Sequence, residues 1–141
     1  MVRVLPGPQW RQFTCEARER FLSTQYQVQP ASDRVGVRLQ GQTLQRRSAK
    51  EVISSGVVTG SIQVPSDGQP IILGADRQTA GGYAQIAVVI GPDLPLLAQL
   101  APGDRVSFQC VTLAEAVEAV RRQKSDEATT CSELPRAILP S

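Results

Sequence analysis

Short apolar segments separated by turn residues constrain the fold of this chain more than any other feature of its sequence. Val2–Leu5, Tyr26–Val28 and Val35–Leu39 alternate apolar with polar residues, which is typical of strands with one buried face. Ile71–Leu73 and Ile86–Ile90 are short runs rich in β-branched residues and predict buried strands. Strict alternation of strands with helices is absent. The pattern predicts a mainly β fold organised as a barrel.

Two or three short helices accompany these strands. Trp10, Phe13, Ala17 and Phe21 recur at helical spacing and predict one helix over Gln9–Ser23. A capping box predicts a helix from Thr112 to about Gln123, and another predicts a short helical turn after Ser48. The spacing of Leu94, Leu97 and Leu100 predicts one or two helical turns. The remaining strand candidates are Val57-Val58, Ile62–Val64 and Arg105–Val111.

The length of 141 residues fits one domain. We assign residues 1–123 to this domain. From Lys124 onward the chain is polar, then proline-containing and aperiodic, which predicts a disordered tail over residues 124–141.

The composition excludes several kinds of site. The chain has no histidine, so a Ser-His-Asp triad within it is excluded. Its three cysteines form no CxxC pair, and we predict no metal site. Cys15 and Cys110 are predicted to be small core residues, and Cys131 lies in the predicted tail. None of the three has the basic neighbours of a reactive thiolate.

Charge and hydropathy argue against two classes of partner. The net charge is +2 with both signs interspersed, which gives no electrostatic footprint for nucleic acid. No apolar run approaches the roughly 18 residues of a membrane-spanning helix. We therefore expect a cytoplasmic protein that binds neither nucleic acid nor membrane.

The segment Gly74–Tyr83, GADRQTAGGY, is the candidate functional site. It places a charge pair, an amide, a hydroxyl, two glycines and a phenol between two core strands. Polar groups at such a position need partners, because burying them unpaired costs a few kcal/mol each. One interpretation is a structural hairpin closed by an ion pair between Asp76 and Arg77. The other is a ligand site, in which Gly81-Gly82 allows close backbone approach.

Four motifs carry a resemblance to a known family. They are SDRVGVRLQG (Ser32–Gly41), SSGVVTGSIQVPSDGQPIIL (Ser54–Leu73), ADRQTAGGYAQIAVVI (Ala75–Ile90) and LAQLAPGD (Leu97–Asp104). In order and spacing they resemble the allophanate hydrolase subunit 2 family, also called carboxyltransferase subdomains A and B. The resemblance covers roughly Val2–Arg122 and implies a cyclophilin-like β-barrel.

The resemblance implies a subunit of an ATP-dependent complex that opens 5-oxoproline to glutamate. The alternative is a carboxyltransferase domain that acts on urea or a similar amide, with biotin on a carrier domain. A third interpretation is a non-catalytic partner-binding module or a truncated remnant. No GxGxxG or GxxxxGK[ST] motif occurs, so we expect ATP to act through the complex and no cofactor to be bound by this chain alone.

Candidate roles follow for individual residues. Asp76 and Tyr83 are the candidate catalytic residues: Asp76 as a base or to orient a substrate amide, and Tyr83 as a donor to a carbonyl oxygen. A guanidinium holds a carboxylate well, which suits Arg77 or Arg34. The other candidate substrate-binding residues are Gln63, Gln78, Thr79 and Gly82. For Ser32-Asp33-Arg34 a turn locked by an Asp–Arg pair is the favoured interpretation.

The family's members are about twice as long, and this chain corresponds to their C-terminal half. We therefore expect the isolated chain to hydrolyse neither 5-oxoproline nor ATP. The expected partners are a protein similar to the B subunit of 5-oxoprolinase or a separately encoded N-terminal half. Self-association is the other expectation, because the surface that meets the other half would expose apolar groups.

Overall fold

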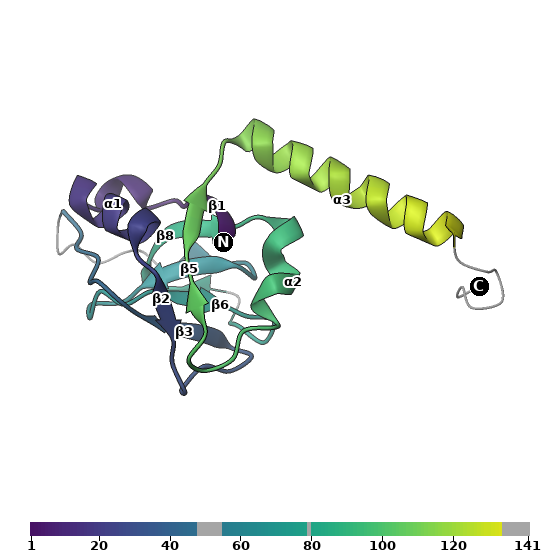
Figure 1. Ribbon diagram of the computed structural model, residues 1–141. Coiled ribbons are helices and arrows are strands. Elements are labelled where there is room, and N and C mark those ends of the chain that lie inside the picture. The colour runs from purple at the N-terminus through teal and green to yellow at the C-terminus, as the bar shows by residue number, and fades with distance from the viewer. Residues whose placement is uncertain (48–54, 79, 134–141) are drawn as a thin grey trace.

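The computed structural model describes residues 1–47, 55–78 and 80–133 of the chain and shows a β-barrel flanked by helices (Figure 1). One sheet has eight strands in the order β10-β1-β8-β5-β6-β3-β2-β9, and a separate ribbon pairs β4 with β7. The strands are β1 Val2–Pro6, β2 Tyr26–Val28, β3 Gly36–Gln40, β4 Ser55–Gly56, β5 Ser61–Val64, β6 Ile71–Leu73, β7 Ala80–Gly81, β8 Ala84–Val89, β9 Arg105–Val106 and β10 Phe108–Cys110.

The two end strands of the sheet, β9 and β10, are consecutive in the chain and are separated only by Ser107. β9 runs antiparallel to β2, whereas β10 runs parallel to β1. Val2 N–H also donates to the Ser107 carbonyl at 2.8 Å. One segment thus joins the two edges, and the mainly β barrel predicted from the sequence is confirmed. The expected strand Arg105–Val111 is this segment, broken in the middle.

The predicted single helix over Gln9–Ser23 is wrong. A 3-10 turn, η1 (Trp10–Gln12), is followed by an isolated β-bridge from Phe13 to Arg46, and only then by α1 (Cys15–Ser23). Thr14 has extended φ and ψ, and its hydroxyl accepts a hydrogen bond from Ala17 N–H at 3.0 Å. A threonine with this geometry is an N-cap, so the helix begins after it.

Aromatic side chains fill the barrel beneath α1. Phe21 stacks on Phe108 with ring centroids 4.6 Å apart, and it also contacts Trp10 and Tyr26. We call these four residues the aromatic cluster. Burial raises the pKa of Tyr26 to about 12, although the nearby Thr24 hydroxyl acts in the opposite direction. The cluster anchors α1 to the closing strand β10.

A buried ion pair ties the first strand to the helical segment η2 (Gly91–Asp93), which continues directly into α2 (Leu94–Leu97). Asp93 accepts hydrogen bonds from the Arg3 backbone N–H at 2.7 Å and from its guanidinium at 2.6 Å. Burial by itself would raise the pKa of Asp93. The hydrogen bonds and charge of Arg3 outweigh burial, so this pKa lies below its usual value. The pair fixes α2 against the barrel.

The helix α3 (Leu113–Glu133) extends away from the barrel (Figure 1). Its predicted capping box is confirmed, because Thr112 Oγ1 accepts from Glu115 N–H at 3.1 Å and Glu115 accepts from Thr112 N–H at 3.4 Å. The helix continues ten residues beyond the expected end at Gln123, so irregular structure is not found between Lys124 and Glu133. The domain boundary at residue 123 stays a prediction. No helix in the described part of the chain is both long and apolar enough to cross a membrane.

Two smaller predictions are wrong, and a third concerns residues that the structure does not describe. Val57-Val58 is not a strand, because the strand β4 ends just before it. Cys15 and Cys110 are exposed, contrary to the prediction of core positions. Partial desolvation of the Cys110 thiol, together with the charge of Glu115, raises the pKa of Cys110. Cys15 Sγ accepts a hydrogen bond from Arg18 at 3.1 Å, a basic neighbour that the sequence did not reveal. The turn predicted after Ser48 lies outside the described residues.

Candidate functional site

The polar segment Gly74–Tyr83 crosses between strands that do not pair with each other. β6 and β8 lie on opposite sides of β5, with Ile62 facing Ile72 on one side and Ala87 on the other. The segment therefore passes over the end of β5, and the hairpin interpretation is wrong. Within this crossing, β7 forms a small ribbon with β4. A crossing of this kind leaves space between the segment and the barrel wall.

That space is a pocket of about 390 Å³, which we call the polar pocket. It contains five of the eight residues proposed from the sequence, together with residues of β3 and β6. Its lining is Asp33, Val35, Gly36, Arg38, Val57, Gln63, Ile71, Leu73, Arg77, Gln78, Gly81, Gly82 and Tyr83. The volume is within the range of sites for small molecules, about 300–1,000 Å³.

Gln63 is the most deeply placed polar residue of this pocket. It is 6% exposed, and its Nε2 atom is buried with no hydrogen-bond partner in the part of the chain that the structure describes. The pairing of β5 with β8 shifts register between Ile62 and Gln63, and such an irregularity re-aims a side chain. A side chain at Gly81 would collide with this amide nitrogen, so the Gln63 side chain would have to move to make room for it. An unpaired buried amide costs about 1–3 kcal/mol, and a ligand that accepts its hydrogen bond would remove this cost.

Arg77 supplies a second unpaired donor to the same pocket. Its Nε atom is buried, and no described residue is its hydrogen-bond partner. Asp33 also lines the pocket, but its Oδ1 accepts the backbone N–H groups of Val35 at 2.9 Å and Gly36 at 3.1 Å. This is the predicted turn before β3. The Asp33 acceptor therefore already has hydrogen-bond partners, whereas a ligand could supply partners for the Gln63 and Arg77 donors.

The ion pairs differ from both pairs expected from the sequence. Asp76 Oδ2 lies 3.1 Å from Arg34 Nε, rather than pairing with Arg77. The turn at residues 32–34 is therefore held by the Asp33 side chain and the backbone, and Arg34 reaches across to the polar segment. Asp76 N–H also donates to the Arg34 carbonyl at 3.0 Å. These contacts fasten the start of the polar segment to the turn before β3.

Three proposed residues do not line the polar pocket. Asp76 is outside it, with its side chain 56% exposed, and Arg34 lines a neighbouring cavity. Thr79 lies outside the described residues. Tyr83 is at the pocket but 53% exposed, so it lies at the rim. The catalytic roles of Asp76 and Tyr83 stay predictions.

Arg38 is a pocket residue that the sequence interpretation did not single out, and for Gly81 it predicted a close backbone approach without its partner Gln63. Arg38 alternates with Val37 and Leu39 in β3, so it projects from the opposite face of the strand. This alternation was the available signal for Arg38. The role of Gly81 depends on contact with Gln63, which is distant in sequence and leaves no local signal.

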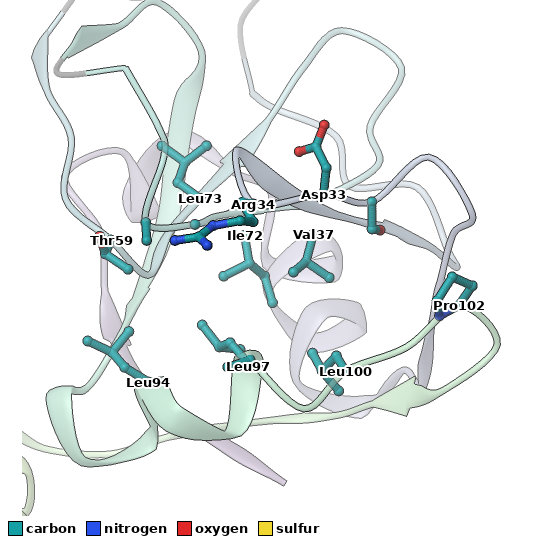
Figure 2. Close-up of a pocket in the computed structure, with 14 residues that line it drawn as sticks. Asp33, Arg34, Val37, Thr59, Ile72, Leu73, Leu94, Leu97, Leu100 and Pro102 are labelled. Atoms are coloured by element: carbon teal, nitrogen blue, oxygen red, sulfur yellow. The ribbon is translucent and has the colours of Figure 1, made fainter.

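The neighbouring cavity is larger, at about 590 Å³, and we call it the apolar cavity. Leu94, Leu97 and Leu100 lie on one side of it, and Val37 and Ile72 lie across from them (Figure 2). The leucines are the residues whose spacing of three predicted helical turns. The two hollows share Asp33 and Leu73 in their linings. Among the described residues, no group of three or more Cys, Asp and Glu side chains is arranged to hold a metal ion.

Comparison with known proteins places this chain in a family. The model of the carboxyltransferase domain, subdomain A and B, matches residues 1–110. The C subunit of 5-oxoprolinase from Escherichia coli K12 is 41% identical over 123 residues, which is 87% of this chain and 40% of that protein. The protein of the same name from Haemophilus influenzae is 41% identical over 124 residues, 88% of this chain and 40% of the relative.

A solved structure shows the same arrangement of the backbone. The crystal structure of the K. lactis urea amidolyase matches with a TM-score of 0.82 and 26% identity, over 88% of this chain and 8% of that protein. The present chain spans about 40% of the length of the two curated relatives. Its motifs, its barrel and these matches together show that the chain belongs to the family of the carboxyltransferase domain, subdomain A and B.

Proposed function

We propose that the polar pocket binds a small molecule that combines a carboxylate with an amide-type carbonyl, as 5-oxoproline does. The observation that carries this proposal is that two buried donors at one pocket, Gln63 Nε2 and Arg77 Nε, have no hydrogen-bond partner among the described residues. The Gln63 amide suits a lactam carbonyl, and the Arg77 guanidinium suits a carboxylate. The relatives named as the C subunit of 5-oxoprolinase favour this ligand over other lactam acids.

The chain would contribute this pocket to a 5-oxoprolinase-like complex. The chain spans 40% of the length of its curated relatives, which are themselves subunits. ATP-dependent ring opening would therefore need a further protein, either one similar to the B subunit of 5-oxoprolinase or a separately encoded N-terminal half. ATP would be handled by the complex, since the sequence has no glycine-rich phosphate loop. A cytoplasmic location remains part of this proposal. The isolated chain should release no glutamate from 5-oxoproline and ATP, and release without any partner would contradict this division of labour.

Ligand titration of the full chain tests the pocket directly. We expect 5-oxoproline to bind at least about tenfold more tightly than cyclopentanecarboxylate, which lacks the lactam carbonyl, because a hydrogen bond to a buried donor is lost. The same ratio is expected against 2-pyrrolidinone, which lacks the carboxylate. Isothermal titration or ligand-observed NMR gives both ratios.

Two variants assign each ratio to a residue. Gln63→Leu should weaken 5-oxoproline without weakening cyclopentanecarboxylate, and Arg77→Met should make 5-oxoproline and 2-pyrrolidinone bind alike. Gln27→Leu and Arg105→Met are matched controls, because both residues are exposed and lie outside the pocket. Absence of 5-oxoproline binding, or binding that neither pocket variant changes, would contradict the proposal.

The second candidate function is carboxyl transfer to urea or a similar amide, with biotin on a carrier domain. The structural match to the K. lactis urea amidolyase favours it, and the Gln63 amide also complements a ureido group. The cyclic urea 2-imidazolidinone separates the two functions. Carboxyl transfer predicts that it binds at least as tightly as 5-oxoproline and that Arg77→Met leaves its affinity unchanged.

A further inference from the structure

The apolar cavity beside the polar pocket has the character of a second small-molecule site. It encloses about 590 Å³ and is bounded by aliphatic side chains from β3, β6, α2 and the residues that follow α2. Figure 2 shows Leu94, Leu97 and Leu100 facing Val37 and Ile72 across the opening. Cavities of this size with mainly apolar walls and a few polar groups are typical ligand sites.

One charged group faces this cavity from its edge. The Arg34 side chain lines the cavity together with Ile72 and Thr59, whereas the Asp33 carboxylate points away from the cavity (Figure 2). The Asp33 Oδ1 atom is also occupied by two backbone N–H groups. Arg34 therefore supplies the cationic group at the edge of the cavity, and its charge is paired with Asp76.

Arg34 is available for exchange with another anion. Its present partner is Asp76, at 3.1 Å, and the two side chains are 79% and 56% exposed. Exposed ion pairs of this kind contribute little to stability, because water competes for both charges. A ligand carboxylate that is held in place by an adjacent apolar chain can therefore replace Asp76 on Arg34.

We propose that the apolar cavity binds an aliphatic monocarboxylate, with its hydrocarbon chain among the three leucines and its carboxylate on Arg34. This site is distinct from the polar pocket and does not depend on the function proposed for that pocket. Its hydrocarbon chain distinguishes its ligand from 5-oxoproline, which has no aliphatic tail to fill such a cavity.

Titration of the full chain with butanoate, hexanoate and octanoate tests the site. Each added CH₂ group that enters the cavity should strengthen binding about fourfold. Octanol, with the same chain length and no carboxylate, should bind more weakly than octanoate by up to about fivefold, the effect expected of an exposed ion pair. All ligands are kept below their aggregation concentrations, and NMR shifts of the leucine methyl groups locate the bound molecule.

Two cavity variants and two matched controls make the test specific. Leu97→Trp fills the cavity and should abolish the chain-length dependence, while Arg34→Gln should remove the preference for octanoate over octanol. Arg38→Gln, an arginine of the polar pocket, should leave both unchanged. Val117→Trp, in the separate groove beside α3, should also leave the chain-length dependence and the preference for octanoate unchanged.

Three results would overturn the proposal. They are binding that does not increase with chain length, equal affinity for octanol and octanoate, and methyl shifts confined to the groove beside α3. A sedimentation result in which a second copy covers the leucines and excludes octanoate would also overturn it. Circular dichroism of Leu97→Trp and Arg34→Gln confirms that each variant is folded before its titration is interpreted.

Discussion

The aromatic cluster and the polar pocket occupy the same barrel but treat their buried groups in opposite ways. In the cluster, Phe21 and Phe108 are fully buried and stacked, and the Tyr26 hydroxyl donates a long hydrogen bond to Gln42 O at 3.5 Å. In the pocket, Gln63 and Arg77 hold buried donors that find no partner within residues 1–47, 55–78 and 80–133. The first region stabilises the fold, whereas the second gives up stability for donors that a ligand can use.

The largest expected effect comes from removing a ring of the cluster. Phe21→Ala should lower the free energy of unfolding by about 3–5 kcal/mol, because it leaves a cavity among three aromatic neighbours. Tyr83→Ala, which removes an aromatic residue at the rim of the polar pocket, should change it by less than about 0.5 kcal/mol. Urea unfolding followed by the fluorescence of the single tryptophan measures both. Equal costs would mean that the two regions do not differ in this way.

The Arg3–Asp93 ion pair tests a buried carboxylate that does have a hydrogen-bond partner. Asp93→Asn should cost about 1–2 kcal/mol at pH 7, a value reduced by solvent because the Arg3 side chain is 39% exposed. The pKa of Asp93 is lowered in the folded protein. Its contribution is therefore present above its ordinary pKa of about 3.9 and is lost as the pH falls through the lowered value.

Urea unfolding of parent and Asp93→Asn between pH 7 and pH 2.5 provides the measurement. The two curves should converge at the acid end. Asp104→Asn serves as a control at an exposed carboxylate that makes a local turn contact, Ala101 N–H to Asp104 at 2.8 Å. A difference between parent and Asp93→Asn that does not change with pH would show that the charge of Asp93 is not what stabilises the contact.

Gln63→Leu should have the opposite sign from ordinary core substitutions. Removing the unpaired amide should raise the free energy of unfolding by about 1 kcal/mol, while binding of 5-oxoproline is lost. The same urea titration, set beside the binding measurement, shows whether stability and binding move in opposite directions. A loss of more than about 1 kcal/mol would mean that the amide is satisfied in solution and that the contrast between the two regions is smaller than the structure indicates.

The smallest effect is expected at the Arg34–Asp76 pair between the two hollows. Arg34→Gln should change the free energy of unfolding by less than about 0.5 kcal/mol, because both side chains are largely exposed. Unfolding at low and high salt checks this, with Arg105→Gln as a control at another exposed arginine. A cost above about 1 kcal/mol would identify the pair as a structural contact and would weaken the case for exchange with a ligand.

The barrel and the family were predictable from the sequence because their signals are local. Alternating strands, the Thr112–Glu115 capping box and four ordered motifs each lie within a short stretch of chain. The polar pocket was predictable in part, since Arg77, Gln78 and Tyr83 belong to one conspicuous segment. Gln63 was proposed because an amide in an apolar strand is unusual.

The failures share a physical cause, which is that tertiary contacts override local patterns. The helix predicted over Gln9–Ser23 is interrupted because Phe13 pairs with Arg46, a residue far along the chain. Asp76 pairs with Arg34 rather than with its neighbour, because the crossing over β5 brings the turn before β3 alongside. Adjacent charges in a sequence carry no information about such distant partners.

The way the barrel closes has a consequence for its synthesis. Val2 in β1 pairs with Phe108 in β10, so the first strand waits for a partner that is made more than a hundred residues later. Pairings between such distant segments form slowly, because the intervening chain must first be ordered. On the ribosome, β1 and β2 each keep one edge unpaired until the segment from Arg105 to Cys110 has left the exit tunnel, and these edges are templates for pairing with other chains. The nascent protein is therefore most prone to aggregate just before its closing strand emerges.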